Sequence, residues 1–194
     1  MIDGSTGNNR SLLAACALRL FVEYGYDGVG VQQIADAAGV TKPTLYHYYG
    51  SKVGLLESLF DEQLAELHDR LKRAADYHHD LPQTLTEVAR AVFAFAKTHP
   101  DLYRLHLSLW FAPVNSEAYR AAARFHERQF AALEKLFRAA AADHGNMKGR
   151  QRAYAATFLG MINNYAALAL NGYAELDEAL ARQSVHQFMH GIFS

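Results

Sequence analysis

Apolar residues recur at helical spacing along almost the whole chain, and glycine and proline fall between the periodic segments. Leu13, Ala17 and Leu20 are an early example, since a spacing of three and four residues lines up side chains on one helix face. Alternation with a period of two, which a half-buried strand would show, is missing. The pattern predicts an all-α fold of about nine helices. They are expected at residues 9–24, 31–38, 42–48, 51–75, 82–97, between Pro100 and Pro113, and at 116–143, 150–171 and 176–190.

Residues 31–49 have the pattern of two short helices joined by a sharp turn. Ile34 lies on the inner face of the first helix, and the small Ala35 lets the second helix approach closely. Gly39 is able to adopt the positive φ that a sharp turn requires, and Thr41 is a good N-cap for the second helix. The second helix then leaves five side chains on its outer surface: Lys42, Thr44, Tyr46, His47 and Tyr48.

Two interpretations of this segment are open, a helical hairpin buried in a core and a helix-turn-helix that reads DNA. A core hairpin has no need for an exposed cluster of Tyr46, His47 and Tyr48 on a two-turn helix. A helix-turn-helix places its second helix in the major groove, where such side chains contact DNA. We therefore predict a DNA-binding helix-turn-helix at residues 31–48.

Residues 10 to about 60 resemble the N-terminal domain of the TetR family of transcription regulators. The motifs that carry the resemblance are Leu20-Phe21, Tyr24-Gly25-Tyr26, Ile34-Ala35, Ala38-Gly39-Val40, Thr44-Leu45-Tyr46, Tyr48-Tyr49, Ser51-Lys52 and Leu55-Leu56. Beyond residue 60 only the helical layout agrees. The resemblance implies a DNA-binding domain at residues 9–55, after a disordered segment at 1–8, and a ligand-binding and dimerisation domain at 56–194.

The resemblance also implies which residues contact DNA. Lys42, Tyr46, Tyr48 and Lys52 match positions that usually contact phosphates, while Thr44 and Tyr46 match positions near base edges. Phosphate contacts position such a protein, and base contacts specify the sequence that it binds. The complete set of expected DNA-binding residues is Gln32, Gln33, Thr41, Lys42, Thr44, Tyr46, His47, Tyr48 and Lys52.

Two departures from the family pattern stand in this segment. Gly30 occupies the cap position before residue 31, where the family usually has Ser or Thr. Glycine is a fair cap, so we expect a loss of only a few tenths of a kcal/mol. Val53 and Gly54 replace a common acidic residue and a small helix former, which we expect to loosen the start of helix 51–75.

The C-terminal half is rich in aromatic residues, and the resemblance implies that it encloses a largely apolar ligand pocket. Plain core packing is the alternative for any single aromatic side chain. Two adjacent asparagines within an apolar helix are more informative, because buried amides need partners. The candidate ligand-binding residues are His106, Trp110, Phe111, His126, Asn163 and Asn164. We expect ligand binding to release a repressor from its operator.

Helices 150–171 and 176–190 are apolar over wide faces, and Ala156 and Gly160 permit close helix approach. The resemblance implies that these two helices form a four-helix interface in a homodimer. A two-fold dimer would place its recognition helices roughly 34–36 Å apart and read a near-palindromic operator.

The charge of the chain is an argument against a strong non-specific DNA binder. Lys and Arg number 19 against 20 Asp and Glu, whereas nucleic-acid-binding domains are usually basic. Positive charge must therefore be concentrated on a small face. The balance leaves open a second interpretation, in which a TetR-like module senses a ligand or binds protein but has lost DNA binding.

Other classes of protein are disfavoured. The single cysteine, Cys16, allows no internal disulfide, and no stretch of 18 apolar residues is present, so we expect a cytoplasmic protein. No nucleophile elbow or phosphate-binding loop occurs, so we expect neither enzymatic activity nor a cofactor. His186 and His190 have a spacing that is able to clip a metal, but no nearby Cys or acidic ligand completes a set, and we predict no metal site.

Overall fold

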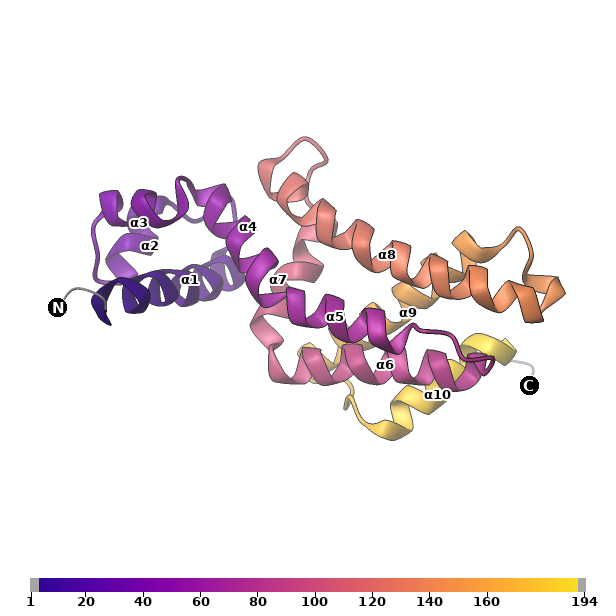
Figure 1. The fold of residues 1–194 in the computed structure, drawn as a ribbon. Helices are drawn as coiled ribbons and strands as arrows, with labels where there is room; N and C mark the ends of the chain where they lie inside the picture. Colours follow the sequence, from indigo (N-terminus) through magenta and orange to yellow (C-terminus); the bar gives the residue numbers. More distant parts are fainter. Residues whose placement is uncertain (1–3, 192–194) are drawn as a thin grey trace. The chain divides into compact units, whose positions relative to one another are not determined.

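The structure is a computed structural model that describes residues 4–191, and these residues form ten α-helices, one 3₁₀-helix and no strand (Figure 1). The all-α prediction is confirmed. The helices are α1 (Gly4–Tyr24), α2 (Val31–Ala37), α3 (Lys42–Tyr49), α4 (Lys52–Gln63), α5 (Ala65–Ala74), α6 (Leu81–Thr98), α7 (Pro100–Trp110), α8 (Glu117–Asp143), η1 (Gly145–Met147), α9 (Gln151–Leu170) and α10 (Glu178–His190).

Two elements differ from the predicted layout. The helix expected at 51–75 is divided at Leu64 into α4 and α5, which accounts for the additional helix. Helix α1 begins at Gly4, so residues 4–8 of the predicted disordered segment are helical. Residues 1–3 of that segment lie outside the described residues.

The helices are grouped into two compact units. The first comprises the chain up to Leu64 together with Asp101–Ala123, so it extends beyond the predicted domain boundary at residue 55 and takes in most of α7 and the first turns of α8. Helix α1 packs against α2, α3 and α4 in this unit. Leu13, Ile34, Leu45 and Leu55 are completely buried there, because each occupies the inward position of its helix.

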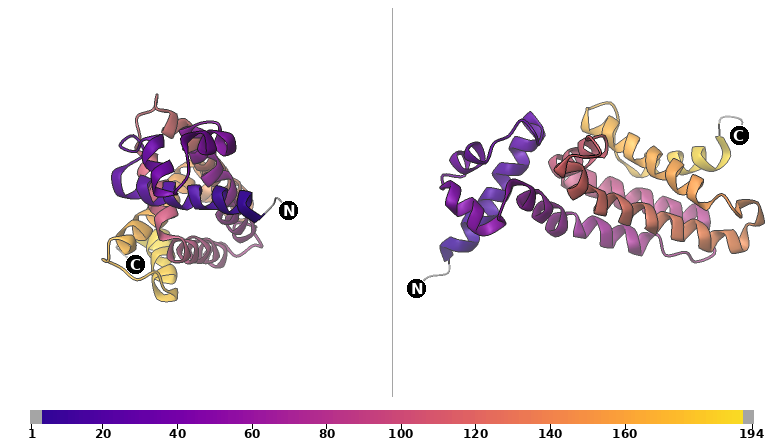
Figure 2. Two further views of the ribbon diagram at one scale, coloured as in Figure 1. Left: turned by 90° about the vertical axis from the view of Figure 1, so that its left-hand side faces the viewer. Right: turned by 90° about the horizontal axis from the view of Figure 1, so that it is seen from above.

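The second unit comprises Ala65–Pro100 and Arg124–Ser194, and α6 is its central helix. Helix α6 packs against α5, α9 and α10 (Figures 1 and 2), and it buries residues on most of its circumference, including Leu85, Val88 and Phe95. No helix within the described ranges is both long and apolar enough to cross a membrane.

Aromatic rings join three helices of the second unit. Phe137 on α8 and Phe158 on α9 lie with ring centroids 6.3 Å apart, and Phe188 on α10 lies 5.1 Å from Phe158. Edge-on contacts of this kind add to the free energy of burial. Phe137 and Phe158 are therefore core residues, as the alternative interpretation of the C-terminal aromatics predicts, while Phe188 is half-buried.

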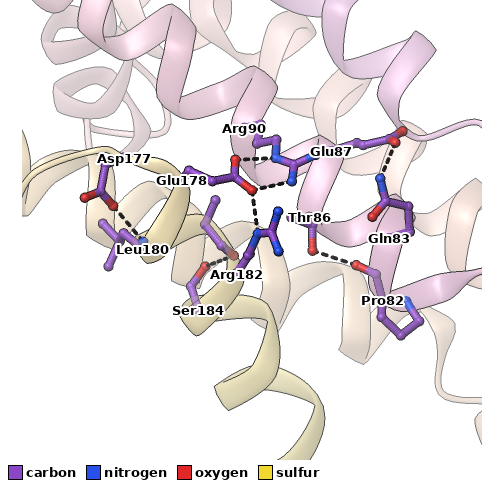
Figure 3. A network of polar contacts seen from close by, with 11 residues as sticks. Pro82, Gln83, Thr86, Glu87, Arg90, Asp177, Glu178, Leu180, Arg182 and Ser184 are labelled. Carbon is purple, nitrogen blue, oxygen red and sulfur yellow. Dashed lines mark hydrogen bonds and ion pairs between the residues drawn. The ribbon is translucent and has the colours of Figure 1, made fainter.

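A polar network ties α10 to α6 at the surface (Figure 3). The Glu178 carboxylate accepts hydrogen bonds from the guanidinium groups of Arg90 on α6 and Arg182 on α10, with the Arg182 Nε–Oε1 distance at 2.6 Å. These two arginines lower the pKa of Glu178 to about 2. Asp177 caps α10 by accepting a hydrogen bond from the Leu180 backbone N–H at 2.7 Å.

Candidate nucleic-acid interface

The turn between α2 and α3 has the geometry that its sequence predicts. Gly39 adopts a φ of 64°, which a residue with a side chain rarely takes. The Gly39 N–H donates to the Asp36 carbonyl at 3.1 Å, and the Val40 N–H donates to the Ala35 carbonyl at 3.0 Å. These bonds satisfy the last carbonyls of α2, so the chain leaves that helix abruptly and re-enters α3 three residues later.

Helix α3 presents one polar face to solvent. Leu45 is fully buried and anchors the helix, while Lys42, Tyr46 and His47 are exposed and Thr44 and Tyr48 are half-buried. About half of the Tyr46 side chain is accessible (48%). This is the arrangement that a helix entering a DNA groove requires, with apolar residues on one side and hydrogen-bonding groups on the other.

Thr41 precedes α3 but does not cap it through its side chain. Its hydroxyl is instead hydrogen-bonded to the Thr44 hydroxyl at 2.9 Å, and its carbonyl accepts from the Leu45 N–H. Thr41 therefore occupies the N-cap position, but the expected capping hydrogen bond from a backbone N–H to its side chain is not made. Its hydroxyl is engaged by the Thr44 hydroxyl instead.

Helix α2 contributes two exposed glutamines, which differ in their surroundings. The Gln32 side-chain amide donates to the Asp36 carboxylate at 2.6 Å, one turn along the helix. Gln33 has no side-chain hydrogen bond within the described residues. Gln33 is thus free to contact a ligand, while Gln32 is held by Asp36.

The two lysines of the expected DNA-binding set are in different situations. The Lys52 ammonium donates to the carbonyls of Tyr26 at 3.0 Å and Val29 at 3.1 Å, and lies 4.1 Å from the centre of the Tyr26 ring. Its charge therefore serves the fold by fastening α4 to the turn after α1. Lys42 is exposed and is the one Lys or Arg between residues 28 and 51. A phosphate contact by Lys52 stays a prediction, and it would be made in competition with these carbonyls.

The junction between α3 and α4 depends on Gly54. A Cβ atom at this position would lie 2.1 Å from the Tyr49 carbonyl oxygen. The Gly54 N–H also donates to the Ser51 hydroxyl at 2.9 Å, which caps α4. Glycine at this position was expected to loosen the start of the helix. It instead permits a close approach that any other residue would prevent.

A second network holds α3 to α1 and α4. The Tyr49 hydroxyl donates to the Arg10 carbonyl at 2.7 Å, and the Arg10 guanidinium pairs with Glu62 on α4. Burial raises the pKa of Tyr49, which keeps its hydroxyl a hydrogen-bond donor. The sequence analysis missed this network, because its members are 39 and 52 residues apart.

Tyr26 links the turn after α1 to the first turn of α8. Its ring packs against Phe21 with centroids 5.1 Å apart, and its hydroxyl donates to the Glu117 carboxylate at 2.6 Å. Burial, with the Glu117 hydrogen bond second, strongly raises the pKa of Tyr26. Both residues belong to the first unit, so Glu117 is a fixed part of the same body as the helix-turn-helix.

Comparisons with known proteins agree on one family. The model of the bacterial regulatory proteins of the tetR family matches residues 13–59. The HTH-type transcriptional activator FasR of Mycolicibacterium smegmatis is 27% identical over 182 residues, which cover 94% of this chain and 81% of FasR. The class D tetracycline repressor protein of Escherichia coli is 39% identical over 61 residues, which cover 31% of this chain and 28% of the repressor.

Solved structures share the fold over nearly the whole chain. The transcriptional regulator FadR from Bacillus subtilis, solved in complex with stearoyl-CoA, has a TM-score of 0.76 at 21% identity and covers 94% of this chain and 98% of its own. The TetR family regulator PfmR from Thermus thermophilus has a TM-score of 0.73 at 20% identity, with coverages of 94% and 99%. The match to the tetR-family model is confined to residues 13–59, and the solved structures show the fold of the chain.

The residues predicted to bind a ligand are distributed over both units of the chain. His106 on α7 is fully buried, and its ring lies edge-on to Tyr103 at 5.4 Å and to Trp110 at 6.5 Å. Phe111 is 88% exposed at the end of α7, so it lines no interior site in this structure. His106 and Trp110 are thus the members of the set that ring contacts bring together.

The remaining ligand candidates lie in the second unit. His126 on α8 is buried, Asn163 on α9 is half-buried, and Asn164 is exposed. The two asparagines point to different environments, because adjacent positions on a helix are about 100° apart. The expectation that both lie inside an apolar helix core is wrong for Asn164.

One buried polar residue was missed by the sequence analysis. Gln129 on α8 is completely buried, and neither atom of its side-chain amide has a hydrogen-bond partner within the described residues. A signal was available, because Gln129 falls between Phe125, His126 and Leu133 on the inward face of an amphipathic helix. A polar residue at such a position marks either a structural network or a ligand contact.

Proposed function

We propose that this protein is a ligand-responsive transcription regulator that binds a near-palindromic operator as a homodimer. The observation that carries the proposal is α3, a recognition helix with Leu45 buried beneath it and Lys42, Tyr46 and His47 facing solvent. FasR, which is similar to this chain over 94% of its length, is named as an HTH-type transcriptional activator, and this supports a regulatory role for the whole chain. Such a role places the protein in the cytoplasm.

The proposed effector is a small, largely apolar molecule that binds in the region 56–194. The FadR structure in complex with stearoyl-CoA supports this, because the fold of that complex is shared over most of both chains. Ligand and operator would then bind antagonistically, with a reciprocal coupling typically of about 1–3 kcal/mol. We propose release of a repressor as the outcome, although the relative FasR is named as an activator and the tetracycline repressor as a repressor.

The proposed dimer uses α9 and α10, in the predicted ranges 150–171 and 176–190. Leu168 on α9 and Met189 on α10 are large apolar residues with exposed fractions of 36% and 38%. Gly160 is exposed on α9, and a Cβ added to it meets nothing within 4 Å in its own protomer. Gly160→Leu would therefore fold normally but block close helix approach, and sedimentation velocity is expected to show a weakened dimer. An unchanged dimer would contradict this interface.

The test of DNA binding is the affinity of the purified protein for DNA flanking its own gene, measured across a salt series. Tyr46→Ala and Lys42→Ala are expected to weaken binding, and Lys42→Ala is expected to reduce the magnitude of the salt slope by about 1. Lys148→Ala removes the same charge from an exposed site outside the helix-turn-helix and is expected to leave affinity unchanged. Equal binding by all four proteins would contradict a role for α3 in reading DNA.

The near-neutral interface favours a second candidate, a TetR-like sensing or protein-binding module that has lost DNA binding. Lys42 is the one cation between residues 28 and 51, and the Lys52 ammonium is engaged by backbone carbonyls. Screening of genomic fragments at low salt separates the two functions. Salt-independent, uniformly weak binding to every fragment would favour the sensing module, since phosphate contacts make binding by a regulator depend on salt.

A further inference from the structure

A pocket in the second unit lies where the first turns of α6 and α9 meet the last two turns of α8 and the end of α10 (Figure 1). It has a volume of about 310 Å³, and all of its lining residues belong to the second unit. This volume is at the lower end of the range for small-molecule sites. The pocket therefore suits a compact molecule rather than one with a long chain.

Three aromatic rings, one from each of three helices, form the walls of the pocket. Phe137 on α8 is completely buried, and its ring centroid lies 5.7 Å from that of Tyr154 on α9 and 6.0 Å from that of Phe188 on α10. The rings of Tyr154 and Phe188 are tilted by 40° and 50° to the Phe137 ring. A further aromatic ring would find both faces and edges to pack against, at the separations that aromatic pairs prefer.

The rest of the apolar lining includes Leu81 and Pro82 from the start of α6 and Met147 from η1. Leu81 and Met147 are buried, so they belong to the inner part of the pocket. Methionine is flexible and polarisable, and its sulfur makes favourable contacts with aromatic rings. The inner surface is thus adapted to an apolar, aromatic guest.

Charged side chains are missing from this lining. None of the residues around the pocket is Lys, Arg, Asp or Glu, although these four types make up 20% of the chain. Transfer of an ion from water to an apolar site is costly unless a counter-charge is present. The lining offers no such group, so the pocket selects against a ligand whose buried part is charged.

Three hydrogen-bonding side chains border the apolar space. The side chains of His144 and Asn146 are exposed, and neither forms a hydrogen bond or ion pair within the described residues. The hydroxyl of the half-buried Tyr154 has no hydrogen-bond partner among the same residues. A few polar groups around an apolar interior are what orients a ligand in a small-molecule site.

The backbone that carries two of these groups is held in place without a ligand. The His144 N–H donates to the Ala140 carbonyl at 3.0 Å, and the Met147 N–H donates to the His144 carbonyl at the same distance. The Arg150 N–H then donates to the Met147 carbonyl, also at 3.0 Å. These bonds connect the end of α8 to the start of α9 through η1, so this side of the pocket is formed before any ligand binds.

We propose that this pocket binds a small, uncharged aromatic molecule that carries one or two hydrogen-bonding groups. The rings of the ligand pack among Phe137, Tyr154 and Phe188. Its polar groups form hydrogen bonds with the Asn146 amide and the Tyr154 hydroxyl. The binding step does not depend on the proposed function, and only the further role of such a ligand as the effector rests on it.

The test is nuclear magnetic resonance of the full-length protein, labelled with ¹³C at the methionine methyl groups. The probes are naphthalene-2-carboxamide, which is uncharged, and 2-naphthoate, its anionic counterpart. The carboxamide is expected to shift the Met147 signal and to leave that of Met161 unchanged, because Met161 on α9 does not line the pocket. The naphthoate is expected to bind about tenfold more weakly or less, since its charge finds no partner.

Two variants examine the pocket from the side of the protein. Asn146→Trp places a large ring at a lining position and is expected to weaken carboxamide binding by about tenfold or more. Asn115→Trp makes the same substitution at an exposed position of the first unit and should bind as the wild type does. Tyr154→Phe keeps the ring and removes the hydroxyl, so the affinity should fall about two- to tenfold.

Three results would overturn the assignment. They are an unchanged Met147 signal at saturating carboxamide, equal affinities for the carboxamide and the naphthoate, and wild-type affinity in a correctly folded Asn146→Trp, with folding checked by circular dichroism.

An operator-binding assay separates this site from the proposed function. If the carboxamide shifts the Met147 signal but leaves operator affinity unchanged, the pocket is supported and a role for this ligand as effector is overturned. If the protein binds no operator at all, the proposed function fails, while the methionine signals still decide whether the pocket binds the probe.

Discussion

Removal of the Tyr26 hydroxyl isolates the contact between the helix-turn-helix and α8. Tyr26→Phe retains the ring that packs on Phe21 and lies beneath Lys52, and it deletes only the donor to the Glu117 carboxylate. A hydrogen bond to a charged group contributes about 1.5–3 kcal/mol. Glu117 is exposed, so water solvates its carboxylate in the variant, and we expect a loss at the lower end, about 1–2 kcal/mol.

The assay is urea unfolding followed by tryptophan fluorescence. Trp110 is the one tryptophan of the chain and belongs to the first unit, as do Tyr26 and Glu117, so its emission reports on the body that contains the contact. Glu117→Gln and the double variant complete a double-mutant cycle. We expect a coupling free energy of about 1 kcal/mol between the two sites.

The pH dependence gives an independent check of this contact. The pKa of Tyr26 is raised in the folded protein, so its contribution is fully present below the unfolded-state pKa of about 10 and is lost only as the pH rises beyond that value. The effect of Tyr26→Phe should therefore be constant between pH 7 and about 9. A coupling free energy near zero would refute the reasoning, since it would mean that solvent replaces the contact without cost.

Three further predictions concern the junction of α3 with α4, the α6–α10 network and the recognition helix. Gly54→Ala should lower the free energy of unfolding by about 1–3 kcal/mol in the same fluorescence assay, because the added methyl group clashes with the Tyr49 carbonyl. An increase in stability, as alanine gives at helix positions without a close neighbour, would contradict the close approach. Glu178→Gln should make the free energy of unfolding depend less on pH in the acid range. The pKa of Glu178 is lowered to about 2 in the folded protein, so its contribution to stability is present above its ordinary pKa and is lost as the pH falls toward 2. Urea midpoints of the variant, followed by circular dichroism, should therefore converge with those of the wild type at low pH. Leu45→Ala should lower the free energy of unfolding by about 2–5 kcal/mol and abolish operator binding, whereas unimpaired operator binding would show that α3 is positioned without this anchor.

The helix-turn-helix was predictable because the interactions that form it are local. Gly39 ends α2 through bonds to Asp36 and Ala35, all within five residues, and Leu45 takes its inward position from helical periodicity. The partners in such contacts are separated by only a few residues, so their spacing in the sequence is enough to identify them. The same holds for the capping of α10 by Asp177, three residues before the Leu180 N–H whose hydrogen bond it accepts.

The roles of individual side chains were not predictable, because they depend on which segments of the chain pack together. Lys52 is on the expected DNA-binding face by residue spacing, yet its ammonium is held by carbonyls 23 and 26 residues earlier. Phe111 has the aromatic character of a pocket residue, but α7 ends beside it and leaves it exposed. A periodic pattern predicts which face of its own helix a side chain lies on. It does not predict which other segment of the chain, if any, packs against that face.

The sequence by itself determined the all-α class, the position of the helix-turn-helix and the inward faces of its helices, since helix periodicity and turn chemistry act over a few residues. Only the tertiary structure decided that Gly54 is required by a backbone approach and that Tyr26 reaches a carboxylate 91 residues away. Such groups are brought together by the packing of helices that are distant in the chain. Helix packing depends on the combined shape of many side chains, which no local spacing rule contains.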